Sequence, residues 1–139
     1  VIAKIIMPKQ LNQNIKPVDL IPVQSLAETT EGTGIDSYLA DGSSFDTALI
    51  GAAVGALGSQ SSTKIKIQES DNAAFASPTT ADGGEEVTVA ADHVYSFQVQ
   101  RKKRYLRAVV TLNTPGETPS AVVHVSGILC NWDRPFPIL

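Results

Sequence analysis

The sequence predicts an all-β fold, built as an antiparallel sandwich or a barrel. Two observations favour this class: several short segments alternate apolar and polar residues, and turn signals rich in Gly, Pro, Asp and Ser separate them. The chain has 139 residues, of which 42% are hydrophobic. This length allows one domain with a single sizeable core.

Residues 1–34 are expected to form an extended N-terminal arm. Pro8, Pro17 and Pro22 leave no room for a helix of useful length. The apolar residues between the prolines make the segment too hydrophobic for a disordered tail. These residues are Ile5, Ile6, Leu11, Ile15, Val18, Leu20 and Ile21. We therefore expect the arm to lie on a surface, either that of its own chain or that of a neighbour.

The first two predicted strands follow the arm. Residues 45–54 form a continuous apolar segment; Ala and Leu would permit a helix, but Gly51 and Gly55 favour a buried strand. Residues 64–68 alternate strictly, with Ile65 and Ile67 expected to face the core. A long loop is predicted for residues 71–86, which are rich in Ala, Ser, Thr, Asp and Gly.

Three further strands are predicted at residues 94–100, 104–112 and 122–129. In the first, Tyr95, Phe97 and Val99 share one face. The second should direct four residues inward: Leu106, Ala108, Val110 and Leu112. The domain then comprises residues 35–130. Residues 131–139 form a C-terminal tail that we expect to dock against a surface, since it contains two prolines and large apolar side chains.

Reactive side chains are few. One Cys and two His (Cys130, His93 and His124) exclude a disulfide scaffold, a Cys/His zinc site and redox chemistry of a cysteine pair. No G-x-S-x-G motif is present, and His124 and Ser126 are expected to form part of a solvent-facing stripe. The acidic residues of the 71–86 loop do not follow the EF-hand pattern. The sequence therefore predicts no catalytic residue, no cofactor and no metal site.

Charge is unevenly distributed along the chain. Residues 1–100 hold twelve acidic and five basic residues, whereas residues 101–139 hold two acidic and six basic ones. Five of those six bases lie in residues 101–107, together with Tyr105. Three interpretations stay open: a solvated hairpin end, an electrostatic contact with an acidic protein, or a nucleic-acid contact. The third is disfavoured, because one hairpin tip offers few phosphate contacts.

No targeting segment or membrane span is expected. The apolar start of the chain is interrupted at Pro8, before any plausible signal cleavage site. The most apolar stretch, residues 48–57, has ten residues, whereas a membrane-spanning helix needs about 20.

Two segments resemble small structural proteins of tailed bacteriophages that decorate or cement capsids. Residues 64–71 (KIKIQESD) are similar to a strand and turn of that family, and residues 103–110 (KRYLRAVV) to a later strand. Both occur in the family's order, and the likeness covers about residues 43–130. The resemblance implies a jelly-roll-like sandwich without catalysis. It also implies a symmetric oligomer, expected here as a homodimer, bound to the major capsid protein on the outer surface of a virion and synthesised in the host cytoplasm.

The resemblance supplies no site residues, so the interface candidates come from the charge and apolar patterns. They are Ile5, Ile6, Leu11, Ile15, Arg101, Lys102, Lys103, Arg104, Trp132 and Phe136. An alternative function is a carbohydrate- or receptor-binding module on a virion or cell surface. That function would need exposed aromatic side chains, and the available ones are Tyr38, Tyr95, Tyr105 and Trp132.

Overall fold

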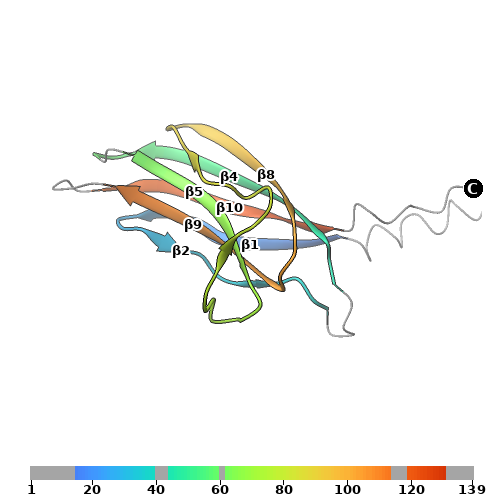
Figure 1. The fold of residues 1–139 in the computed structure, drawn as a ribbon. Coiled ribbons are helices and arrows are strands. Elements are labelled where there is room, and N and C mark those ends of the chain that lie inside the picture. Colours follow the sequence, from blue (N-terminus) through green and yellow to red (C-terminus); the bar gives the residue numbers. More distant parts are fainter. Residues whose placement is uncertain (1–14, 40–43, 60–61, 114–118, 131–139) are drawn as a thin grey trace, which may run out of the picture.

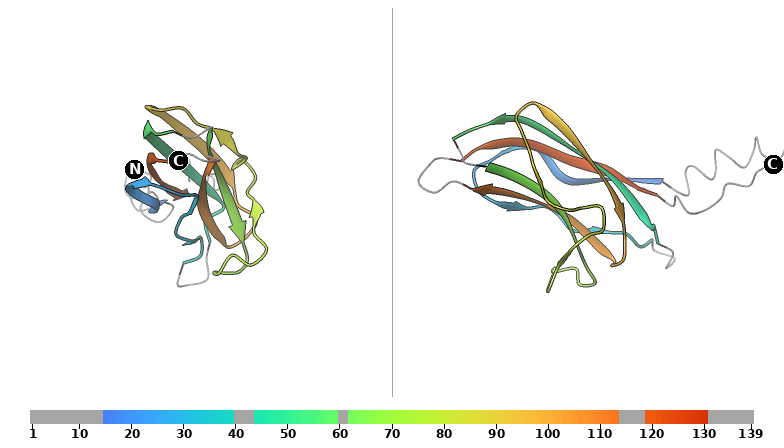
Figure 2. Two further views of the ribbon diagram at one scale, coloured as in Figure 1. Left: turned by 90° about the vertical axis from the view of Figure 1, so that its left-hand side faces the viewer. Right: turned by 45° about the horizontal axis from the view of Figure 1, so that its top comes forward.

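The computed structural model describes residues 15–39, 44–59, 62–113 and 119–130. These residues form two antiparallel sheets that pack face to face, which confirms the predicted all-β sandwich (Figures 1 and 2). The strands are β1 (Ile15–Leu26), β2 (Thr30–Glu31), β3 (Ile35–Asp36), β4 (Thr47–Leu57), β5 (Ser62–Ser70), β6 (Thr79–Thr80), β7 (Val87–Thr88), β8 (His93–Gln100), β9 (Tyr105–Asn113) and β10 (Ala121–Cys130).

Each sheet joins strands that are distant in the sequence. The first sheet, sheet A, has the order β1-β10-β4-β8. The second, sheet B, has the order β2-β9-β5-β6, with β3 also pairing with β9 and β7 with β5. The chain therefore crosses between the sheets several times, and residues 101–104 make one such crossing from β8 to β9.

The predicted inward-facing sets are confirmed. Ile65 and Ile67 of β5 are fully buried, while Lys64 and Lys66 beside them are partly exposed. Phe97 and Val99 of β8 are buried, and so are all four residues predicted to point inward from β9. The apolar segment at residues 45–54 is also a strand, since β4 occupies Thr47–Leu57 and no helix forms there.

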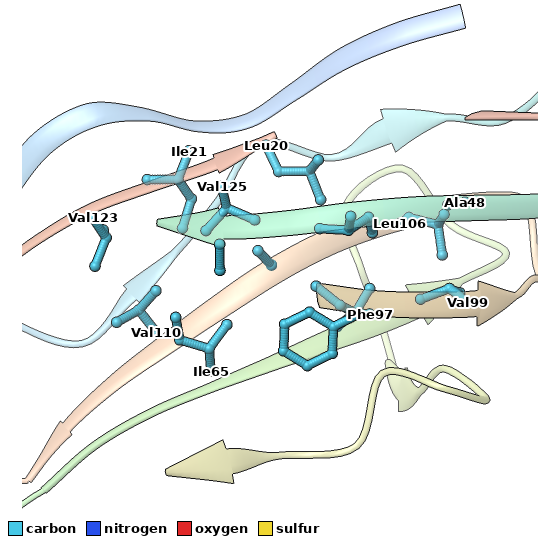
Figure 3. Packing of buried hydrophobic residues seen from close by; sticks show 14 of the residues in the cluster. Leu20, Ile21, Ala48, Ile65, Phe97, Val99, Leu106, Val110, Val123 and Val125 are labelled. Carbon is cyan, nitrogen blue, oxygen red and sulfur yellow. The ribbon is translucent and has the colours of Figure 1, made fainter. Parts of the chain in front are cut away.

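Aliphatic side chains from both sheets fill the space between them (Figure 3). Val123 and Val125 of β10 lie opposite Ile65 and Val110 of sheet B. The Phe97 ring of β8 packs in the same cluster. Burying one such side chain contributes about 1.5–3 kcal/mol relative to leaving it exposed. The core therefore holds the two sheets together.

The expected N-terminal arm needs a correction for its second half. Residues 15–26 form β1, an edge strand paired with β10, and Leu20 and Ile21 are part of the core. Pro17 and Pro22 are accommodated because an edge strand has one side that needs no sheet hydrogen bond. The register also shifts between Asp19 and Ile21 and between Ile21 and Gln24. The domain boundary drawn after residue 34 therefore falls inside the sandwich.

The loop predicted at residues 71–86 also contains regular structure. Thr79 and Thr80 form β6, which pairs with the end of β5. The Phe75 side chain is buried although its backbone has a φ of 55°, a left-handed conformation that non-glycine residues seldom adopt.

Candidate interaction site

Several predicted interface segments converge on one end of the sandwich. A row of paired residues crosses sheet A there: Ile15, Cys130, Thr47 and Gln100. The turn 101–104 continues from Gln100 into β9, and Tyr105 at the start of β9 pairs with Asp36 and Ser70. Figure 1 shows β1 and β10 side by side at this end. We call it the basic end, defined by Asp36, Tyr38 and residues 101–105.

The turn of the basic end is fixed by a buried carboxylate. Glu69 ends the inward-facing series of β5 and is 3% exposed. Its Oε1 accepts hydrogen bonds from the backbone N–H groups of Lys102 and Lys103, at 2.9 and 3.1 Å. Hydrogen bonds to a charged acceptor contribute about 1.5–3 kcal/mol each. Glu69 thereby holds both lysines at defined backbone positions.

Arg101 is anchored to the segment that precedes β4. Its Nε donates to the Phe45 carbonyl, and its Nη2 donates to the Ser44 hydroxyl at 3.1 Å. The Nη1 donates to the Lys103 carbonyl at 3.3 Å, across the turn. Its guanidinium therefore stabilises the fold by satisfying backbone carbonyls.

Arg104 is held by a carboxylate and two aromatic rings. Its Nε and Nη2 donate to the two oxygens of Asp36, both at 2.9 Å. Its guanidinium carbon lies 4.5 Å from the ring centroid of Tyr38 and 5.2 Å from that of Tyr105. The hydrogen bond lowers the pKa of Asp36 and raises the pKa of Arg104. Lys16 lies close enough to lower the pKa of Asp36 further, so its positive charge adds to this end.

The two segments that carry the bacteriophage resemblance are neighbouring strands. Residues 64–71 span most of β5, and residues 103–110 span the end of the turn and most of β9. Their polar side chains meet: Arg107 Nε donates to Gln68 Oε1 at 3.0 Å, and its Nη1 lies 2.7 Å from a Glu31 oxygen. The Arg107 guanidinium also lies 4.4 Å from the centroid of the Phe75 ring. Gln68 and Arg107, one from each segment, therefore stabilise the pairing of β5 with β9.

A second candidate surface is the outer face of sheet A. Ser126, Gly51 and Ser96 form its central row, and Leu49 and Ile128 pair in the next row. Because these side chains are small, the row leaves a shallow hollow of about 460 Å³. Leu49 is 39% exposed at its wall. The outward residues of β4 and β8 are all uncharged, and those of β8 include the polar Ser96, Gln98 and Gln100. This half of the face therefore offers an uncharged contact surface.

The remaining polar candidates have ordinary local partners. His124 Nε2 lies 3.3 Å from Asp19 at the β1 edge, and His93 Nδ1 lies 2.7 Å from the Ala91 carbonyl. Burial raises the pKa of the Cys130 thiol, which disfavours its reactive thiolate form. Within the described part of the chain, no three His, Cys, Asp or Glu side chains are placed to hold a metal ion.

The structure locates only part of the predicted interface. Ile15 is exposed at the start of β1, and Arg101, Lys102, Lys103 and Arg104 form the turn. Five candidates lie outside the described residues: Ile5, Ile6, Leu11, Trp132 and Phe136. Sequence reasoning missed the roles of Asp36, Tyr38 and Glu69. The alternation of β5 does carry the signal for Glu69, because it puts this carboxylate on the inward face.

Comparisons with known proteins add no identity. No protein-family model matches the sequence, and no significant match exists among curated proteins or solved structures. Among the described residues, no helix is long and apolar enough to cross a membrane.

Proposed function

We propose that this chain is a structural virion protein that binds the outside of a phage capsid. In this role it cements neighbouring subunits of the major capsid protein and stabilises the shell, without catalysing a reaction. The proposal begins from the resemblance of residues 64–71 and 103–110 to capsid decoration proteins. The two segments are neighbouring strands that join through side-chain hydrogen bonds, which supports treating them as one unit.

The convergence of contact segments on the basic end carries the proposal. Residues 1–14 and 131–139 lie outside the described residues, but they are joined to Ile15 and Cys130, which pair directly. The positively charged turn lies at the same end. The described part of the chain therefore begins and ends beside the basic turn, next to the two segments that the sequence predicts to make contacts.

The strand order supports the jelly-roll part of the proposal. Each sheet places an early strand beside a late one, β1 beside β10 in sheet A and β2 beside β9 in sheet B. The jelly roll has such pairing, because its chain folds back on itself as a long hairpin.

The proposed homodimer fits the outer face of sheet A best. The outward residues of β4 and β8 are uncharged, whereas Asp19 and His124 lie on the β1 and β10 part of this face. Two copies that meet over β4 and β8 therefore do not bring like charges together. A side chain at Gly51 would enter the hollow without a close contact, since its nearest neighbour is the Ser126 carbonyl at 4.0 Å. We expect Gly51→Arg to convert a dimer to a monomer in sedimentation velocity. Lys66→Glu on sheet B should leave it unchanged; a monomeric wild type would remove the dimer from the proposal.

The direct test compares purified capsids with and without this chain. The source phage is grown with the gene intact or deleted, and the capsids are examined for stoichiometric incorporation and for the temperature at which they release DNA. We expect the chain in fixed ratio to the major capsid protein, and earlier DNA release without it. Capsids that lack the chain, or that are equally stable after its deletion, would contradict the proposal.

One observation favours the alternative of a carbohydrate- or receptor-binding module. The Tyr38 side chain is 36% exposed beside the guanidinium groups of Arg101 and Arg104, a setting that suits sugar hydroxyls. Both tyrosines of the basic end already contact Arg104, however, which reduces their open ring surface. A glycan array probed with wild type and Tyr38→Ala would show sugar binding that depends on this ring, if the alternative holds.

A further inference from the structure

We propose that Lys102 and Lys103 make the contact between the basic end and an acidic protein surface, with Glu69 as the positioning residue for both. This inference rests on the proposed function, because it names the chemistry of the partner that the basic end would meet. In the run of positive charge at residues 101–104, the two lysines would bind the partner, whereas Arg101 and Arg104 stabilise the fold.

The geometry of the turn separates backbone anchoring from side-chain availability. Glu69 holds Lys102 and Lys103 through their N–H groups alone, at 2.9 and 3.1 Å. The Lys102 residue is exposed and Lys103 is partly exposed. A buried carboxylate that accepts two adjacent N–H groups fixes where two consecutive side chains begin. The lysines are thus presented together from a defined backbone.

The arginines of the run are committed to the fold. Arg101 donates to the Phe45 carbonyl and the Ser44 hydroxyl, and Arg104 binds both oxygens of Asp36. A guanidinium that forms such fixed, two-pronged hydrogen bonds loses them when it turns to a partner. Among the described ion pairs, Arg104 takes part and the two lysines do not. The lysines are therefore the cations that a partner can engage at least cost to this fold.

Charge complementarity selects the partner. Lys16 acts on Asp36 from the same end and adds to the four cations of residues 101–104. Among the described residues, the acidic ones that bond this end of the sandwich are Asp36, Asp46, Glu69 and Asp82, so positive charge is in excess in the field around the lysines. Carboxylates on another protein fit this field, whereas nucleic acid binding draws on many phosphate contacts along a wider basic surface. Sheet B carries a separate pair of cations at Lys64 and Lys66, of which Lys64 already faces Glu86 at 3.7 Å.

The test measures binding of the full chain to poly-L-glutamate and to capsids of the source phage stripped of this chain. We expect Lys102→Glu with Lys103→Glu to weaken both interactions by about tenfold or more at low salt. Lys64→Glu with Lys66→Glu is the matched control, because it changes the net charge equally on the outer face of sheet B, and it should weaken binding less than about threefold. Equal losses in the two double variants would overturn the assignment, since binding would then follow net charge alone.

The role of Glu69 is tested by two variants that differ in one respect. Glu69→Gln keeps an oxygen that can accept both N–H groups, and we expect its binding to stay within about twofold of wild type. Glu69→Ala loses the acceptor and should bind about fivefold or more weakly, at temperatures where circular dichroism shows it folded. If Glu69→Ala does not fold, the lysine variants and Glu69→Gln still decide: a Glu69→Gln variant that binds as weakly as the lysine double variant would overturn the positioning role.

The two probes separate this inference from the proposed function. Wild type that binds poly-L-glutamate through the lysines but does not bind capsids would contradict the capsid role and leave the lysine assignment standing. A Lys102→Glu, Lys103→Glu double variant that binds capsids as well as wild type would contradict the lysine assignment and leave the capsid role standing. Tighter binding to duplex DNA than to poly-L-glutamate through the same lysines would overturn the choice of an acidic protein.

Discussion

The outer faces of the two sheets differ although their inner faces are alike. Sheet B directs Lys64, Lys66 and Arg107 outward and gives two of these cations partners on its own surface. Sheet A directs mostly uncharged side chains outward, such as Leu49, Gly51 and Ser96, with Asp19 beside His124 as the exception; a hollow lies over its central row. Aliphatic side chains fill the space between the sheets from both sides.

This difference separates the requirements of folding from those of contact. Inward residues are set mainly by the core, because a polar side chain there loses apolar burial and needs a hydrogen-bond partner, as Glu69 has. Outward residues are not constrained in this way. Their chemistry therefore reflects whether the surface contacts water or another protein. A face whose charges have partners on the same sheet suits water, whereas the uncharged, hollowed part of sheet A over β4 and β8 suits another protein surface.

The largest change in stability is expected when an inward and an outward residue of the same strand are each replaced by alanine. Ile67 of β5 is fully buried, and Lys66 beside it points outward. Ile67→Ala should lower the free energy of unfolding by about 2–5 kcal/mol, because it removes buried methyl groups and leaves a cavity. Lys66→Ala should change it by less than about 0.5 kcal/mol. Urea unfolding followed by circular dichroism measures both; similar losses would contradict the inward and outward assignment.

The next effect concerns two glycines of sheet A. A Cβ on Gly127 would overlap the Leu49 carbonyl oxygen and lie 2.9 Å from the Ile50 Cα, whereas a Cβ on Gly51 meets only the Ser126 carbonyl, at 4.0 Å. Gly127→Ala should therefore destabilise the protein by about 1–3 kcal/mol. Gly51→Ala should be neutral or stabilising by up to about 1 kcal/mol. Thermal unfolding of both variants measures the difference. Equal midpoints for Gly127→Ala and Gly51→Ala would contradict the open space above Gly51.

These two predictions also show what could be inferred from the sequence. The strict alternation around Ile65 and Ile67 was enough to identify β5 and its buried face. Strand β1 was missed because Pro17 and Pro22 mask it, although Leu20 and Ile21 reach the core. An edge position tolerates prolines, but the sequence does not show which strand lies at an edge.

The candidate site was predictable only in pieces. The basic run at residues 101–107 was visible as a charge pattern, but its internal partners were not. Asp36 lies 68 positions before Arg104 in the sequence, and Glu69 lies 33 before Lys102, so no local pattern joins them. Only the pairing of distant strands brings these carboxylates to the turn.

A smaller effect is expected on the charged face of sheet B. The Arg107 side chain is 12% exposed and contacts Gln68, Glu31 and the Phe75 ring. Arg107→Ala should lower the free energy of unfolding by about 1–2 kcal/mol, because it removes a hydrogen bond, an ion pair and a cation–π contact together. Arg107→Lys should recover only part of this loss, since an ammonium cannot reproduce the planar geometry. Full recovery in denaturant unfolding would show that charge alone matters here.

The smallest effect concerns pH and the pair at the basic end. The pKa of Asp36 is lowered in the folded protein, mainly by the hydrogen bond from Arg104. A carboxyl with a lowered folded pKa stabilises the fold above its unfolded pKa, and this contribution is lost as the pH falls through the folded pKa. Asp36→Asn should therefore be less stable than wild type at pH 6 and should approach it below about pH 4. The measurement is the thermal midpoint of wild type and of Asp36→Asn between pH 6 and pH 2. A difference between the two midpoints that stays constant over this range would contradict this account.

The pairing of Ile15 with Cys130 has a mechanical consequence. Pulling these two residues apart would peel β1 from β10 one hydrogen bond at a time, which resists force poorly. Pulling both in the same direction along the strands, against a load held at β4, would instead act on the whole ladder between β10 and β4 at once, in shear. Tension shared by Ile15 and Cys130 would therefore be resisted by the stronger of the two geometries.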